Sequence, residues 1–168
     1  MKLLAAPNDW LDKVVEPFDF DALDAKQISQ DMVSLMQKEG GLGLSANQVG
    51  VNGQILVIRP ILLEDKTPLT IINPEIVEVS SETEIMVEGC LSYPDLFLHV
   101  KRPKQVVVKY LDTSAKECII ELYDIDARCF LHEFDHLNGI KFVDRVSKMK
   151  LDRALKKQNK IQKRKING

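Results

Sequence analysis

The sequence has few cysteines and no long hydrophobic run. No stretch approaches the roughly 20 consecutive apolar residues that a membrane-spanning helix needs, so a transmembrane segment is not expected. Three cysteines cannot all pair within one chain, and an odd count without an export signal points to a reducing compartment, where a cysteine is a small hydrophobe or a thiolate ligand. The apolar part of residues 1–7 is too short for a secretory signal. These absences predict a soluble, cytoplasmic protein.

The chain is long enough for one globular domain and is divided in charge. Its 168 residues are 45% hydrophobic and 29% charged, which suits a single domain with its own core. Residues 1–140 contain 12 Lys+Arg and 23 Asp+Glu, a net charge of −11, whereas residues 141–168 contain 11 and 2, a net charge of +9. We therefore expect an acidic globular domain, residues 1–146, followed by a basic helical tail, residues 147–168.

Hydrophobic periodicity predicts an α+β fold. A helix is expected between Asp21 and Lys38, another from Asp124 or Asp126 to Leu137 with the Asp as N-cap, and a third near residues 147–156. Short runs rich in Val, Ile, Tyr and Thr predict strands at 54–58, 69–72, 76–79, 105–111 and 117–123. Because no helical pattern separates these strands, antiparallel pairing is favoured over βαβ units.

The segment His132-Glu133-Phe134-Asp135-His136 carries the strongest chemical signal. Histidines at i and i+4 lie on one helix face, with Cβ atoms about 6 Å apart, so both can reach one metal ion. Glu133 borders that face and can accept a proton from a water at the metal, as in the H-E-x-x-H metalloproteases. The spacing therefore predicts a metal site.

A first-row metal needs a third protein ligand, and the residues leave two choices. His99 is expected to be exposed, and Cys118 belongs to a strand pattern that suggests the core. Cys90 follows a glycine that permits close backbone approach, whereas Cys129 lies three residues before His132 on the same helix. Spacing alone does not choose between them, but one helix rarely supplies three tetrahedral ligands, which favours Cys90.

Three segments together resemble peptide deformylase. The family pattern is G-x-G-L-A-A-x-Q, then E-G-C-L-S, then H-E-x-x-H, and these stand here at 41–48, 88–92 and 132–136 with similar intervals. The resemblance, which extends over roughly residues 3–145, implies antiparallel sheets packed around a central metal-binding helix, with a C-terminal helix. It also implies a hydrolase that removes the formyl group from N-formylmethionine at the start of newly made polypeptides and releases formate.

The resemblance implies roles for individual residues. The metal would be held by Cys90, His132 and His136, with water in the fourth position. Fe²⁺ is the usual metal of such enzymes, and Zn²⁺, Ni²⁺ or Co²⁺ can replace it. Glu133 would act as general base and then general acid. The oxyanion hole would consist of the Gln48 side-chain amide and the Leu91 backbone N–H.

The resemblance also implies a substrate site in which Gly43 contacts the peptide backbone. The pocket for the methionine side chain would be lined by Leu44, Glu88, Ile125, Arg128, Cys129 and His132. Arg128 stands where an aliphatic residue is usual, so its stem is expected to line the pocket and its guanidinium to reach solvent or an acidic group. This predicts a shifted preference at the pocket mouth.

Two other departures have smaller expected consequences. Leu131 replaces a common Gln, which predicts an effect on metal affinity, and Ser45 replaces Ala, a small-for-small change that puts little in doubt.

The basic tail and two other function classes remain open. The tail is either a solvated face or an electrostatic contact to the ribosome. No membrane contact and no sequence-specific nucleic acid is expected. The first alternative is a metallopeptidase, which would lack the cysteine of E-G-C-L-S. The second is a non-catalytic ribosome-binding module with a structural metal. In that case Glu133→Gln would keep the metal and lose no other property, whereas an enzyme would lose turnover.

Overall fold

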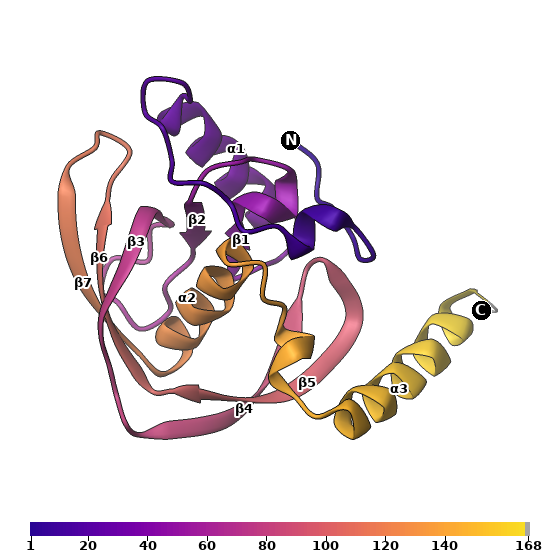
Figure 1. Cartoon of the computed structure of the whole chain (residues 1–168). Helices are drawn as coiled ribbons and strands as arrows, with labels where there is room; N and C mark the ends of the chain where they lie inside the picture. Colours follow the sequence, from indigo (N-terminus) through magenta and orange to yellow (C-terminus); the bar gives the residue numbers. More distant parts are fainter. Residues whose placement is uncertain (167–168) are drawn as a thin grey trace.

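The computed structural model describes residues 1–166, which form two antiparallel sheets around one central helix (Figure 1). A five-stranded sheet has the order β1-β2-β3-β6-β7, and a hairpin of β4 and β5 forms the second sheet. Both the α+β class and the antiparallel pairing are confirmed. The last two residues of the predicted tail, 167–168, lie outside the described residues. The elements in chain order are η1 (Asp9–Asp12), α1 (Ala25–Lys38), β1 (Gly43–Ser45), η2 (Ala46–Val49), β2 (Ile55–Ile58), β3 (Leu69–Val79), β4 (Thr83–Cys90), β5 (Tyr93–Pro103), β6 (Gln105–Leu111), β7 (Glu117–Tyr123), α2 (Asp124–Leu137), η3 (Phe142–Arg145) and α3 (Lys148–Ile166).

Helix α2 is the central element, on which strands of both sheets pack. It contacts β1, β2, β5, β6 and β7, and Figure 1 shows it enclosed by the strands. Its Ala127 and Phe130 are fully buried in the main core, where all four residues of β2 are buried as well. A helix buried on most of its faces can hold polar side chains only where other elements supply their partners. Such partners surround the two histidines.

The two ends of α2 are built differently. The predicted aspartate N-cap is wrong: Tyr123 is the cap residue and no side chain accepts from the first turn. The buried carboxylate of Asp126 instead accepts from the backbone N–H groups of Ile61 and Leu62. At the other end Gly139 has φ 68°, and its N–H donates to the carbonyl of residue 136 while that of residue 140 donates to the carbonyl of residue 135. This Schellman turn ends the helix as predicted.

The hairpin β4–β5 is absent from the sequence prediction. In β5 the side chains alternate, with Leu96, Leu98 and Val100 buried and the residues between them exposed. In β4 the usual pattern is reversed, because Ile85 and Val87 are exposed while Glu88 is buried. The two strands predicted at 69–72 and 76–79 are one strand, β3, with register shifts in its middle.

Helix α3 covers most of the predicted helical tail. It continues to residue 166, past residue 156, where the apolar pattern fades. Leu151 and Ala154 pack on a small second core formed by Leu96, Leu98, Val100 and Phe142. No helix among residues 1–166 is both long enough and apolar enough to cross a membrane.

Candidate metal centre

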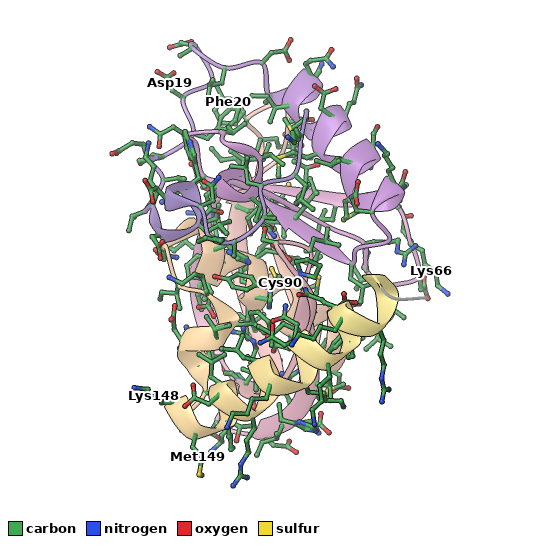
Figure 2. All side chains as sticks on the ribbon, turned by 90° about the vertical axis from the view of Figure 1, so that its right-hand side faces the viewer. Asp19, Phe20, Lys66, Cys90, Lys148 and Met149 are labelled. Atoms are coloured by element: carbon green, nitrogen blue, oxygen red, sulfur yellow. The ribbon has the colours of Figure 1, made fainter. Side chains whose placement is uncertain are left out.

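Three predicted metal ligands meet between α2 and the tip of the β4–β5 hairpin. The ligand atoms of Cys90, His132 and His136 all lie within 4.8 Å of one another. The Sγ of Cys90 is 3.3 Å from Nε2 of His136, and the two imidazole rings have centroids 5.1 Å apart. Figure 2 shows Cys90 near mid-height of the molecule, between the N-terminal segments and α3. The structure thus brings Cys90, rather than Cys129, to the two histidines.

The donors suit a tetrahedral first-row metal. Bonds of about 2.0–2.3 Å separate tetrahedral ligands by roughly 3.5 Å, close to the 3.3 Å between Sγ of Cys90 and Nε2 of His136. Nδ1 of His136 is buried and has no hydrogen-bond partner among the described residues. Burial, and after it the charges of His132 and Arg102, lower the pKa of His136 well below its usual value. A neutral imidazole is the form that binds a metal, so the lowered pKa of His136 suits a ligand.

His132 is oriented by a buried carboxylate. Its Nδ1 lies 3.0 Å from Oε2 of Glu88, which leaves Nε2 free to face Cys90 and His136. Arg102 donates to both oxygens of the same carboxylate, at 2.6 and 3.0 Å. Although burial alone raises the pKa of Glu88, the hydrogen bonds from His132 and Arg102 lower that pKa to about 2. Glu88 is therefore ionised, and a carboxylate on the second ring nitrogen is the usual way to fix a histidine ligand.

Arg128 completes this network, and its guanidinium is buried. Nη1 donates to Oε1 of Glu88 at 2.6 Å and to the carbonyl of Val100 at 2.9 Å, and Nη2 donates to the carbonyl of Glu84 at 2.8 Å. Of the two expected destinations for this guanidinium, the acidic group is confirmed and solvent is not. Arg128 therefore fastens α2 to both strands of the hairpin. Its Nε is buried without a partner among the described residues.

Glu133 lies beside the metal ligands in a buried position. Its Oε2 accepts from the hydroxyl of Ser45 at 2.7 Å. A Cβ atom added to Gly43 would lie only 2.6 Å from Oε1, so this oxygen is against the backbone of β1. Burial raises the pKa of Glu133, while His132 and the Ser45 hydroxyl act in the opposite direction. A carboxylate with a raised pKa is suited to accept and return a proton near neutral pH.

Gln48 is held with its amide nitrogen toward the metal ligands. Its Oε1 accepts from the backbone N–H of Ser45 at 2.8 Å. Its Nε2 lies 3.1 Å from Oγ of Ser92 and 3.5 Å from Sγ of Cys90. The donor half of the amide therefore faces the centre. Leu91, the other predicted oxyanion residue, lies next to Cys90 and lines the adjoining cavity.

A cavity of about 590 Å³ opens beside Glu133 and Cys90. Five of the predicted substrate residues line it: Gly43, Glu88, Ile125, Arg128 and Cys129. His132 lines it as well, whereas Leu44 is fully buried in the main core and is not among the lining residues. Burial raises the pKa of the Cys129 thiol, so Cys129 is a neutral part of the wall. His99 is exposed, as predicted.

Sequence reasoning missed the residues that support the site from outside. Arg102, Asp135 and Arg145 form a chain of ion pairs that ends on Glu88. Asn47 donates to the backbone carbonyl of His136. The only hint in the sequence was Glu88 itself, because a glutamate that faces inward requires a buried cation. Without the pairing of β4 with β5, that position could not be recognised.

Comparisons with known proteins agree along nearly the whole chain. The family model described as polypeptide deformylase matches residues 1–152. Peptide deformylase of Rhizobium meliloti is 38% identical over 162 residues, which cover 96% of this chain and 93% of that protein. The crystal structure of peptide deformylase from Ehrlichia chaffeensis has a TM-score of 0.86 and 38% identity, covering 99% of this chain and 98% of that one. That of a Synechococcus elongatus peptide deformylase in complex with actinonin has a TM-score of 0.86 and 37% identity, covering 94% and 87%.

Proposed function

Since the chain belongs to the peptide deformylase family, metal-dependent hydrolases that remove the formyl group from nascent peptides, we propose that Cys90, His132 and His136 hold its metal. The observation that carries this assignment is the approach of the three donor atoms to within 4.8 Å of one another. Two imidazoles and a thiolate suit Fe²⁺, Zn²⁺, Ni²⁺ and Co²⁺ alike. We take Fe²⁺ as the native ion, because it is the metal that the sequence resemblance implies.

The metal would polarise the formyl oxygen and lower the pKa of a water at the site from near 16 toward about 7. Glu133 accepts a proton from the attacking water and later gives it to the departing amine. One water is consumed, the C–N bond breaks, and formate and a free N-terminus leave. The buried position and the raised pKa of Glu133 support its roles as base and as acid.

Gln48 and Leu91 are proposed to stabilise the negative charge that develops on the formyl oxygen. The Gln48 amide is held from both ends, so its N–H group needs no reorientation during the reaction. The Leu91 backbone N–H would be the second donor. Removal of one donor of this kind typically costs on the order of 3 kcal/mol in the barrier.

The cavity beside Glu133 is proposed to receive the methionine side chain, with Gly43 along the peptide backbone. Ile125 and Cys129 supply apolar or neutral wall, which suits an unbranched thioether. Leu44 would contribute from behind this wall. Arg128 replaces an aliphatic residue with a buried cation, so we expect it to shift the preference for the first residue. Rates for Arg128→Ile that equal the parent's across a panel of first residues would contradict this.

Residues 147–168 are proposed as a basic tail that packs on a catalytic domain of residues 1–146 through Leu151 and Ala154. The positive charge of the tail is complementary to RNA, which supports a contact with the ribosome in the cytoplasm, where formylated chains are made. Ribosome pull-down at increasing salt tests this. Binding that is insensitive to salt, or equal after removal of 147–168, would count against it.

One experiment tests the whole assignment. Formate release from a formyl-methionyl peptide is measured together with the metal content of the same sample, in air and under anaerobic conditions. We expect Glu133→Gln to retain metal and lose turnover, with the exposed Glu75→Gln as the matched control. An iron-loaded sample should lose activity in air, because a thiolate-bound iron is open to oxidation. Turnover by Glu133→Gln at the parental rate would overturn the general-base role.

A further inference from the structure

Ser45 makes a contact with the catalytic helix that its small size did not suggest. It ends β1 and is fully buried. Its Oγ lies 2.7 Å from Oε2 of Glu133 and 2.8 Å from the backbone carbonyl oxygen of the same residue. Alanine, the common residue at this point of the motif, offers no such hydrogen bond.

The two oxygens of the Glu133 carboxylate therefore have different surroundings. Oε2 accepts from Ser45, whereas Oε1 lies against Gly43, where a Cβ atom would approach it to 2.6 Å. Gly43 and Glu133 both line the cavity that is proposed to receive substrate. The serine thus occupies Oε2, and Oε1 lies on the side of Gly43, a residue that lines the cavity.

We propose that Ser45 is a positioning residue, whose hydroxyl holds Oε2 of Glu133 so that Oε1 is the atom that accepts and returns the proton. The proposal rests on the proposed role of Glu133 as general base. Proton transfer requires a heavy-atom separation of about 2.6–3.2 Å in the reacting complex. A carboxylate that can turn about its terminal bond spends less time in that geometry than one that is fixed at one oxygen.

A purely structural role for Ser45 is the alternative. The hydroxyl also approaches the Glu133 carbonyl, so it could simply fasten β1 to α2. Such a role would change thermal stability in proportion to activity and would be independent of the Glu133 carboxylate. If Ser45 positions Glu133, the loss of its hydroxyl should lower activity only when residue 133 carries a carboxylate on a side chain of the length of glutamate.

The test compares Ser45→Ala in two backgrounds. In the parent enzyme we expect kcat to fall about ten- to thirtyfold, since a hydrogen bond to a charged group is lost, with KM and metal content within about twofold. In Glu133→Asp, whose shorter carboxylate cannot keep the contact, the same change should cost nothing further. Ser45→Thr, which retains the hydroxyl, should recover most of kcat. Ser29→Ala is the matched control. Ser29 is a buried serine whose hydroxyl oxygen lies 2.7 Å from that of Thr70, and neither residue belongs to the metal centre.

Each result decides the proposal. An equal loss of kcat in the parent and Glu133→Asp backgrounds, an effect on KM alone, or equal losses in Ser45→Ala and Ser45→Thr would overturn it. Melting temperatures recorded for every variant identify any loss that follows unfolding. If Glu133→Gln is inactive and Ser45→Ala turns over like the parent, only the positioning role fails. If Glu133→Gln is fully active, the general-base assignment itself fails.

Discussion

Gly43→Ala tests how closely β1 packs against α2 at Glu133. The added Cβ would lie 2.6 Å from Oε1 of Glu133, 2.7 Å from its Cγ and 2.9 Å from Sγ of Cys129. All three separations are shorter than normal contact, so either the strand or the helix side chains must move. Glu133 cannot move freely, because Ser45 holds its other oxygen at 2.7 Å.

The expected losses follow from this crowding. Overpacking of this kind typically costs about 1–3 kcal/mol. For a chain of this size, about 3 °C in melting temperature corresponds to 1 kcal/mol, so we expect a decrease of roughly 3–9 °C. Displacement of a catalytic group by about 1 Å can cost about a hundredfold in rate, so kcat should fall far more than stability alone explains.

The assay combines thermal melting with formate release. Gly53→Ala is the control for crowding elsewhere, because its Cβ would lie 3.0 Å from Cδ2 of Phe18 and 3.2 Å from Cδ1 of Leu23, neither of which belongs to the site. Adding Cys129→Ala to Gly43→Ala removes only the contact with sulfur, so it should recover part of the stability and little of kcat. A Gly43→Ala enzyme that melts and turns over like the parent would refute the packing described here.

Three further predictions concern the supporting structure. The Glu88 carboxylate should stabilise the fold fully above pH 4.5 and lose this effect as pH falls toward 2, since its folded pKa is about 2. Because Glu88→Gln removes the effect, urea unfolding of the metal-free protein should show the difference in free energy of unfolding between parent and variant shrinking by about 3 kcal/mol over that range. A constant difference would contradict this. Asp126→Asn should weaken the anchor of residues 61–62, with a loss of about 1–3 kcal/mol and faster proteolysis within 59–68 than in the exposed control Asp124→Asn. Leu151→Ala should accelerate hydrogen exchange in α3 and leave α2 unchanged, and equal acceleration in both helices would show that they unfold together.

The sequence predicted the elements whose side chains obey a simple period. Strands β6 and β7 begin and end where the apolar runs do, and α2 ends at the predicted Asn-Gly stop. Helix α1 was found because Met32, Leu35 and Met36 recur on one face. In α1, β6 and β7 one face meets the core, so the pattern alone indicates the structure, whereas α2 is buried on most of its faces and was predicted from its Asn-Gly stop.

The hairpin β4–β5 could not be predicted because its inward face is partly ionic. Glu88 and Arg102 point inward, while Ile85 and Val87 are exposed. A buried carboxylate is stable only with its cation, and here the cations come from β5 and α2. Such pairs obey no local period, since the partners lie 14 and 40 residues apart.

Local spacing by itself determined that two histidines share a helix face and that a glutamate borders it, because one helical turn fixes those distances. Only the tertiary structure decided which thiol lies beside them, since Cys90 approaches from another element while Cys129 lies on the helix and forms the cavity wall. It likewise decided that the Arg128 guanidinium is buried on Glu88 and that the Ser45 hydroxyl contacts Glu133 across 88 residues. These contacts depend on how separate elements dock, and the free energy of docking comes from the whole core rather than from any one segment.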